Sequence, residues 1–103
     1  VKIAEIIKNV VFELYGYKLE LKQPNDLLLN NKKICGILTE CSTEAGVVKK
    51  VYIGIGFNVN QKNFNKDIEQ IATSLLKEFN IKFKREKIII SIIEKMNKLI
   101  SSL

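Results

Sequence analysis

Apolar residues recur with helical spacing over residues 1–15 and again in two segments near the carboxyl end of the chain. In the first segment they fall on one side of the expected helix. Gly16 follows at the position where a helix commonly ends. The same i, i+3, i+4 spacing predicts helices over residues 68–79, with Asp67 near the start, and over residues 88–100.

Between these helices the pattern changes to the two-residue alternation that is typical of strands. The expected strands span residues 17–22, 26–29, 32–41 and 47–60. Gln23-Pro24 interrupts regular pairing because proline lacks a backbone donor. Asn30-Asn31 favours a two-residue hairpin turn, and residues 42–46 are expected to form a polar loop. No connection is long enough for a crossover helix, so we expect antiparallel pairing.

These elements predict an α+β fold, with an antiparallel or mixed sheet and helices packed on one of its faces. We treat residues 1–103 as a single domain, since the length argues against two. Hydrophobic residues make up 47% of the chain, which is enough for a core and too much for a disordered chain.

The last expected strand has two different faces, because alternate side chains of a strand point in opposite directions. Its odd positions are apolar: Val51, Ile53, Ile55, Phe57 and Val59. Its even positions are Tyr52, Gly54, Gly56, Asn58 and Asn60. This face therefore has no side chains at its two glycines and polar side chains after them. Strand glycines cost stability, so two on one face need a reason. A bend or bulge is one reason, and a flat ligand oriented by the asparagines is the other.

The net charge of +6 does not by itself indicate a nucleic-acid-binding protein. The lysines are spread along the chain among apolar residues, as on solvated faces, so we do not expect direct nucleic-acid binding. An acidic protein partner would suit the charge equally well. No apolar run approaches the roughly 18 residues of a membrane-spanning helix, and the chain starts in an amphipathic pattern without a targeting segment. The expected location is the cytoplasm, without membrane association.

Cys35 and Cys41 lie six positions apart in one expected strand. Their Cα atoms would be about 20 Å apart, which is beyond disulfide reach. The chain has no histidine and no second cysteine pair. We therefore expect free thiols and no metal site built from side chains.

Three segments resemble motifs of the biotin–protein ligases, the biotin–[acetyl-CoA-carboxylase] ligases. Residues 22–26, Lys-Gln-Pro-Asn-Asp, resemble the family's Lys-Trp-Pro-Asn-Asp signature. Residues 32–40 are similar to its Lys-Ile-Ala-Gly-Ile-Leu strand, and residues 54–60 to its Gly-Ile-Gly-Ile-Asn-Val-Asn strand. Residues 72–75 and the helix start at Arg85-Glu86 also resemble the later helices of the family, so the likeness covers essentially the whole chain.

The resemblance implies a class II synthetase-like catalytic domain. Such a ligase couples biotin to ATP, forming biotinyl-adenylate and pyrophosphate, and then transfers biotin to a lysine of a carboxylase carrier domain. Charge repulsion between the carboxylate and the polyphosphate is the obstacle to the first step. A positioned ammonium group and Mg²⁺ stabilise the developing charge.

The motif positions carry the family's site residues onto this chain. Lys33 would be the catalytic ammonium and would also contact biotin. Asp26 would accept the proton of the incoming lysine. Biotin would lie on Gly36, Gly54 and Gly56, and the adenylate would contact Asn25, Asp26, Phe57 and Asn58. Strict alternation separates Lys33 from Gly36, so the resemblance requires a backbone role for Gly36 or a local bulge. Turn chemistry after the proline remains the alternative for Asn25 and Asp26.

The chain departs from the family pattern in two residues and one absence. Gln23 replaces a tryptophan beside the site, and Cys35 replaces an alanine. The glycine- and arginine-rich loop that covers the adenylate has no counterpart before residue 22. We therefore expect the chain to be the carboxy-terminal half of a catalytic domain, inactive on its own and prone to form a homodimer through unpaired edges. The alternative is a non-catalytic ligase-like module that binds a ligand or a partner.

Overall fold

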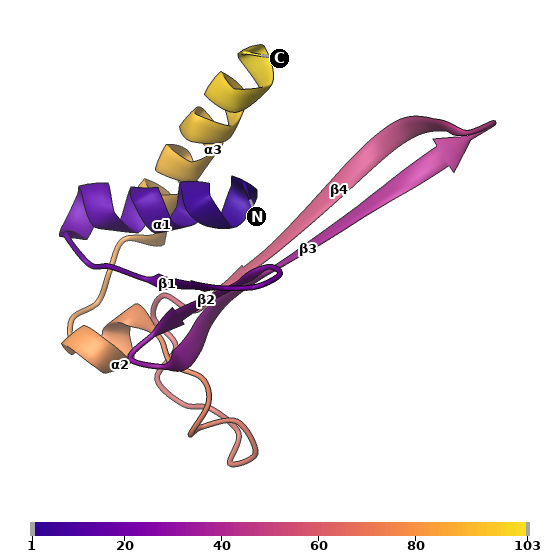
Figure 1. Cartoon of the computed structure of the whole chain (residues 1–103). Helices are drawn as coiled ribbons and strands as arrows, with labels where there is room; N and C mark the ends of the chain where they lie inside the picture. Colours follow the sequence, from indigo (N-terminus) through magenta and orange to yellow (C-terminus); the bar gives the residue numbers. More distant parts are fainter. Residues whose placement is uncertain (1, 103) are drawn as a thin grey trace.

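The structure, a computed structural model, describes residues 2–102 and contains a four-stranded antiparallel sheet with three helices (Figure 1). The elements follow in the order α1 (Lys2–Tyr15), β1 (Glu20–Lys22), β2 (Asp26–Leu29), β3 (Lys32–Glu44), β4 (Val47–Phe57), α2 (Leu75–Phe79) and α3 (Arg85–Ser101). Spatial order in the sheet is the chain order, β1-β2-β3-β4. The predicted α+β class is confirmed. No helix among the described residues is both long and apolar enough to span a membrane.

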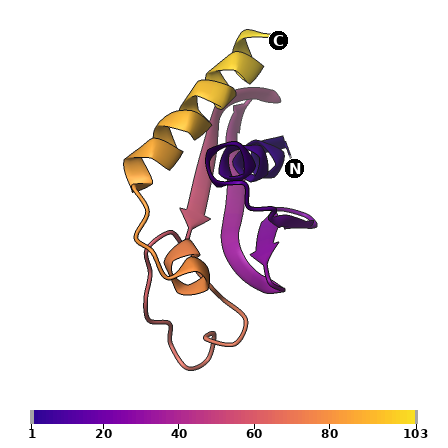
Figure 2. The ribbon, with the colours of Figure 1, turned by 90° about the vertical axis from the view of Figure 1, so that its left-hand side faces the viewer.

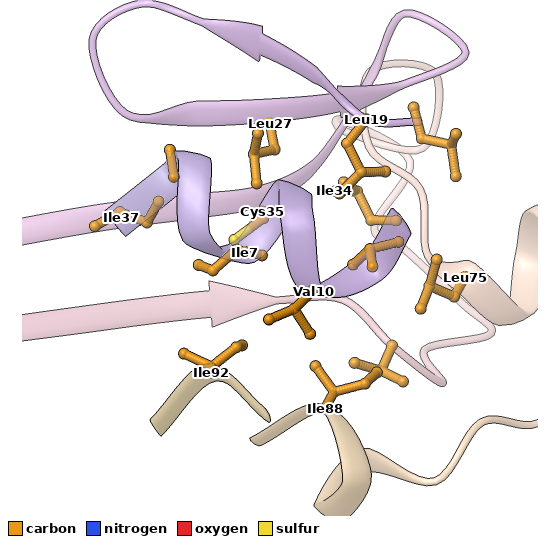
Figure 3. Packing of buried hydrophobic residues seen from close by; sticks show 14 of the residues in the cluster. Ile7, Val10, Leu19, Leu27, Ile34, Cys35, Ile37, Leu75, Ile88 and Ile92 are labelled. Carbon is orange, nitrogen blue, oxygen red and sulfur yellow. The ribbon is translucent and has the colours of Figure 1, made fainter. Parts of the chain in front are cut away.

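The core lies between the inner half of the sheet and the helices α1 and α3. Ala4, Ile7, Val10 and Val11 of α1 are fully buried, as the helical spacing of the sequence predicted. They belong to one core cluster with buried side chains of β2, β3, α2 and α3, which include Leu27, Ile34, Cys35, Leu75, Ile88 and Ile92 (Figure 3). Gly16 ends α1 in a left-handed conformation (φ +76°), and its N–H donates to the carbonyl of Phe12.

The outer half of the β3–β4 hairpin extends beyond the helices as a two-stranded arm (Figure 1). In the view of Figure 2 the hairpin lies behind α1. The predicted polar loop over residues 42–46 is wrong, because β3 continues to Glu44 and only Ala45 and Gly46 form the turn. Both turn residues have positive φ, 52° and 77°, as a two-residue hairpin requires. Val51 is 57% exposed, so the apolar row of β4 packs under a helix only toward its carboxyl end.

The predicted helix over residues 68–79 is also wrong, because only Leu75–Phe79 is helical. The Oγ of Ser74 accepts a hydrogen bond from the N–H of Lys77, which makes Ser74 the N-cap. Before it, residues 66–71 form turns, in which the N–H of Glu69 donates to the carbonyl of Asn65 and the N–H of Ala72 donates to the carbonyl of Ile68. Residues 71–73 then bond to the backbone of Lys33 at the start of β3, and the turns do not continue as a helix.

Two further strand boundaries differ from the prediction. The first strand begins at Glu20 rather than at Tyr17, because pairing with β2 starts at Glu20 and Leu28. The long strand ends at Phe57 rather than near Asn60. The predicted turn at Asn30-Asn31 is confirmed, with both residues at positive φ.

Glu78 of α2 joins the β2–β3 turn to the segment before the helix. Thr73 donates its hydroxyl to Oε2 of Glu78 at 2.5 Å, and the side-chain amide of Asn30 donates to Oε1. The hydrogen bond from Thr73 is the main cause of a lowered pKa for Glu78, and the bond from Asn30 adds to it. The charged form of Glu78 is therefore the form that the fold holds.

Acid should weaken the fold partly through Glu78. Since the folded state lowers its pKa, its contribution is present above the ordinary value of 4.5 and is lost as the pH falls through the lowered pKa. Urea unfolding at neutral pH and at decreasing pH should show a smaller acid-induced loss of unfolding free energy for Glu78→Gln than for the unsubstituted chain. Glu69→Gln serves as the control, and an unchanged acid dependence in Glu78→Gln would contradict the assignment.

Candidate active site

A bulge in β3 sets the geometry of the site. Leu27 pairs with Cys35 and Leu28 pairs with Lys33, so Ile34 is an extra residue on the β3 side. Ile34 and Cys35 are adjacent in sequence and are both buried in the core. Regular alternation would turn one of them outward, and the bulge removes that conflict.

The same bulge brings Lys33 and Gly36 to one face of the sheet. A Cβ added to Gly36 would lie 3.0 Å from Cε and 3.1 Å from Nζ of Lys33. The lysine side chain therefore lies directly over the backbone of Gly36. The resemblance required either a bulge or a backbone role for Gly36, and the structure contains the bulge.

Asp26 shares this place with the lysine. Its Oδ1 lies 3.4 Å from Nζ of Lys33, and the side chains keep 32% and 53% of their surface exposed. Asp26 is also the register partner of Gly36, which fixes its position against the strand. At this exposure the ion pair adds little to stability. Its effect is to hold an ammonium group and a carboxylate together at the edge of an open surface.

Gly54 and Gly56 form the floor of a shallow pocket next to this pair. The pocket has a volume of about 450 Å³ and is lined by Asp26, Lys33, Gly36, Ile37, Leu38, Gly54, Ile55 and Gly56. Cβ atoms at Gly54 and Gly56 would come no nearer than 3.8 Å and 3.9 Å to other atoms. Packing inside the chain therefore does not require these glycines. The pairing of β3 with β4 is regular at both glycines, so a bulge does not explain them either. Their open face is compatible with close approach by a molecule outside the chain.

A second pocket of about 440 Å³ adjoins the first and shares Lys33, Gly36 and Gly56 with it. Its other lining residues are Cys35, Asn58, Ile68, Ile71 and Ala72. Ile68 and Ile71 are 40% and 62% exposed although they are large and apolar. The sequence assigned both to the core face of a helix and missed them as pocket residues. Their position outside any helix could not be read from apolar spacing.

Backbone hydrogen bonds fasten the wall of the second pocket to Lys33. The N–H of Lys33 donates to the carbonyl of Ile71 at 2.7 Å, and the N–H of Thr73 donates to the carbonyl of Lys33 at 2.9 Å. The carbonyl of Asn58 accepts from the N–H of Leu75 at 3.2 Å. Residues 71–75 are therefore held against the start of β3 and against the residue that follows β4.

The remaining predicted residues fall in different places. Asn58 lines the second pocket, whereas Phe57 lies on the opposite face, in a groove against α3. The carbonyl of Asn25 accepts from the N–H of Ile37 at 3.0 Å. Asn60 was grouped with Asn58 as a ligand-orienting asparagine, and this is wrong. Its amide donates to the carbonyl of Phe83 and accepts from the N–H of Phe83, both at 2.8 Å.

The donor set of the site is poor in metal ligands. Among residues 2–102, no group of three or more histidine, cysteine, aspartate or glutamate side chains could hold a metal ion. Asp26 is the carboxylate that lines the first pocket. One carboxylate suits Mg²⁺ that arrives with phosphate groups and keeps several waters, since Mg²⁺ in such sites is bound by one or two carboxylates.

Residues 4–58 match the model of the biotin/lipoate A/B protein ligase family. The chain belongs to this family. The match contains the motif segments around Asp26 and Lys33 and most of the glycine strand. The resemblance to biotin–protein ligases that the motifs predicted is thereby confirmed.

Individual relatives agree with the family assignment. The bifunctional ligase/repressor BirA of Bacillus subtilis is 44% identical over 79 residues, which is 75% of this chain and 24% of that protein. The apo structure of biotin protein ligase from Aquifex aeolicus superposes with a TM-score of 0.84 at 25% identity, covering 97% of this chain and 43% of that one. The same ligase in complex with biotin and ATP gives 0.79 at 24% identity, covering 93% and 39%. The chain thus spans about a quarter of the curated relative and under half of the solved structures. The predicted class II synthetase-like fold of this ligase family is confirmed.

Cys35 should be chemically inert although it lines the second pocket. Burial raises the pKa of the Cys35 thiol to about 12, with a further rise from Asp26 that Lys33 partly offsets. At pH 8 only about one molecule in ten thousand would carry the reactive thiolate at that pKa. Iodoacetamide followed by peptide mass spectrometry should therefore modify exposed Cys41 and leave Cys35 unmodified. Unfolding in urea should make both react, and equal rates in the folded chain would contradict the burial of Cys35.

Proposed function

We propose that this chain provides the floor and the catalytic lysine of a biotin–protein ligase site. The proposed activity is the ATP-dependent joining of biotin to a lysine of a carboxylase carrier domain, as in a biotin–[acetyl-CoA-carboxylase] ligase. The observation that carries the proposal is the position of Lys33, whose ammonium lies over Gly36 and beside the open floor at Gly54 and Gly56. Membership of the family and the biotin- and ATP-bound Aquifex aeolicus ligase of the same fold support it.

In the proposed first step a carboxylate oxygen of biotin attacks the α-phosphorus of ATP, and pyrophosphate leaves. Both reactants are anions, so their approach needs positive charge close to the reacting atoms. Lys33 would supply that charge from the rim shared by the two pockets, with biotin in the first and the nucleotide in the second. Mg²⁺ bound with ATP would neutralise charge on the phosphates.

The two pockets differ in the chemistry that they offer. The first has a bare glycine floor, on which the flat ring system of biotin would lie. The second is lined by Asn58 together with apolar residues, which would suit the adenine base, with its polar edge and its flat face. Asn25 and Asp26 would lie toward the phosphates, and Phe57 would act through its backbone, because its side chain points to the opposite face.

In the proposed second step the amine of the acceptor lysine attacks the acyl carbon, and AMP leaves. The amine must lose a proton, and Asp26 would accept it. Asp26 would then act from within the ion pair with Lys33, at 3.4 Å. Protonation would neutralise Asp26 and so leave Lys33 free to hold the phosphate of the departing AMP.

We place the chain in the carboxy-terminal half of the catalytic domain and expect a cytoplasmic enzyme. This placement rests on motif order and on the coverage of less than half of the Aquifex aeolicus ligase. A non-catalytic ligase-like module is the alternative, and its binding surface would be the same open sheet face. Binding of the reaction intermediate separates the two.

Replacing Lys33 with alanine should weaken binding of biotinyl-adenylate. A lost charge-assisted contact costs about 1.5–3 kcal/mol, which is roughly a ten- to hundredfold rise in Kd. Isothermal titration calorimetry with a non-hydrolysable biotinyl-adenylate analogue measures this directly. Lys49→Ala removes an exposed lysine of the hairpin arm and should leave Kd unchanged. Absence of binding to the unsubstituted chain, or equal effects of the two substitutions, would favour the module.

The chain alone should transfer negligible biotin to a carrier domain. The glycine- and arginine-rich segment that covers the adenylate in the family has no counterpart among its residues, so water would reach the intermediate. Streptavidin blotting of an acceptor domain incubated with the chain, biotin and Mg-ATP tests this, with a full-length biotin–protein ligase as the positive control. Transfer by the chain at a rate comparable to the control would overturn the expectation.

A further inference from the structure

Two polar side chains of the described residues, Thr73 and Ser74, are fully buried. Ser74 is explained by its place at the start of α2, where its Oγ caps the helix and its hydroxyl donates to the carbonyl of Gln61 at 2.6 Å. The hydroxyl of Thr73 donates instead to Oε2 of Glu78 at 2.5 Å. A buried hydroxyl without an acceptor costs free energy, so the position of Thr73 depends on that carboxylate.

Thr73 connects Glu78 to the backbone of Lys33. The N–H of Thr73 donates to the carbonyl of Lys33 at 2.9 Å, and the N–H of Lys33 donates to the carbonyl of Ile71 at 2.7 Å. Lys33 and Ala72 thereby form an isolated parallel β-bridge. An isolated bridge lacks the neighbouring ladder pairs that support a longer strand, so it depends on whatever else holds residues 71–73 in place.

Glu78 also holds the turn that precedes Lys33. The side-chain amide of Asn30 donates to Oε1 of Glu78, so α2 lies beside the β2–β3 turn (Figure 1). One carboxylate is therefore bonded on both sides of the lysine, to the turn before it and to the segment that pairs with it. The bond from Thr73 is partly buried and is the main cause of the lowered pKa of Glu78, so we expect it to contribute more than the exposed bond from Asn30.

The short helix α2 gives Glu78 a fixed position. Leu75 is fully buried in the core cluster. The N–H groups of Leu75 and Leu76 donate to the carbonyls of Asn58 and Val59 at 3.2 Å and 2.9 Å, which fastens α2 to the chain that follows β4. Glu78 thus joins that part of the chain to the start of β3, and both parts line the second pocket.

We propose that Glu78 is a positioning residue for the second pocket. Through Thr73 its carboxylate holds residues 71–73 against Lys33, and so fixes both the wall of that pocket and the lysine at its rim. Glu78 is not among the residues that line either pocket, so it would act without touching a ligand. The inference rests on the proposed function for the identity of that ligand, the nucleotide part of biotinyl-adenylate.

The floor of the first pocket should not depend on Glu78. Gly54 and Gly56 are set by regular pairing with Leu38 and Gly36 of β3. Loss of the carboxylate should therefore weaken binding of a ligand that reaches the second pocket and spare biotin alone. A carboxylate that only stabilised the fold would not distinguish the two ligands.

Hydrogen exchange of the ligand-free chain, resolved by NMR, tests the positioning. In Glu78→Ala the amides of Lys33 and Thr73 should exchange roughly tenfold faster or more, because the bridge opens more often without its support. The amides in the buried part of α1 should keep their rates. Glu13→Ala is the matched control, since it removes a carboxylate from an exposed ion pair between α1 and α3, and it should change neither set of amides.

Calorimetric titration of the same variants tests the consequence for the pocket. Ordering a loosened segment on binding costs affinity, so Glu78→Ala should raise the Kd of the non-hydrolysable biotinyl-adenylate analogue roughly two- to tenfold. Biotin alone should keep its Kd. Glu13→Ala should leave the Kd of both ligands unchanged. Should Glu78→Ala fail to fold, Glu78→Gln retains one acceptor oxygen and should show smaller changes in the same direction.

Four results would refute the positioning role. Unchanged exchange at Lys33 and Thr73 would show that the carboxylate does not hold the bridge, and equal acceleration in α1 would show a general loss of stability. An unchanged Kd for the analogue, or an equal rise for biotin, would show that the effect is not specific to the second pocket. If the unsubstituted chain binds neither ligand, the proposed function fails, and the exchange rates alone decide whether Glu78 positions Lys33.

Discussion

The extra residue at Ile34 is the constraint on which the rest of the site depends. Ile34 and Cys35 are adjacent and both point into the core, while Lys33 and Gly36, three positions apart, lie on the open face. In a regular strand the members of each pair would point to opposite faces. The bulge allows both arrangements and gives up one ladder position. Core packing and the position of Lys33 are therefore set by the same irregularity, so a change that straightened β3 would disturb both.

The sequence predicted those elements whose local pattern agrees with their tertiary surroundings. α1 buries the side that its spacing marked, the turn at Asn30-Asn31 has the conformation that asparagine tolerates, and α3 begins at Arg85. The candidate site residues came from motif positions, and the structure brings five of them, Asp26, Lys33, Gly36, Gly54 and Gly56, together around one pocket. Strict alternation also placed Lys33 and Gly36 on opposite faces of the strand, which indicated a bulge between them. Only the structure shows that Ile34 is the extra residue of that bulge.

The failures arose where hydrogen bonds from distant segments decide the conformation. Ile68 and Ile71 have helical spacing, yet the carbonyl of Ile71 accepts from the N–H of Lys33, nearly forty residues earlier. Asn60 is polar on a ligand-like face, yet its amide is occupied by the backbone of Phe83. Such partners cannot be read from spacing, because spacing records which side chains share a face and not which backbone groups meet.

Lys33 belongs to both pockets in two ways, with its side chain at the rim and its backbone bonded to residues 71 and 73. If both cavities take ligands, this double attachment would couple them thermodynamically. A ligand that restricts the motion of residues 71–73 would also restrict the backbone of Lys33, and the entropy of ordering that backbone would then already be lost. A molecule that enters the other cavity afterwards would bind more tightly, by the same factor in either order of addition.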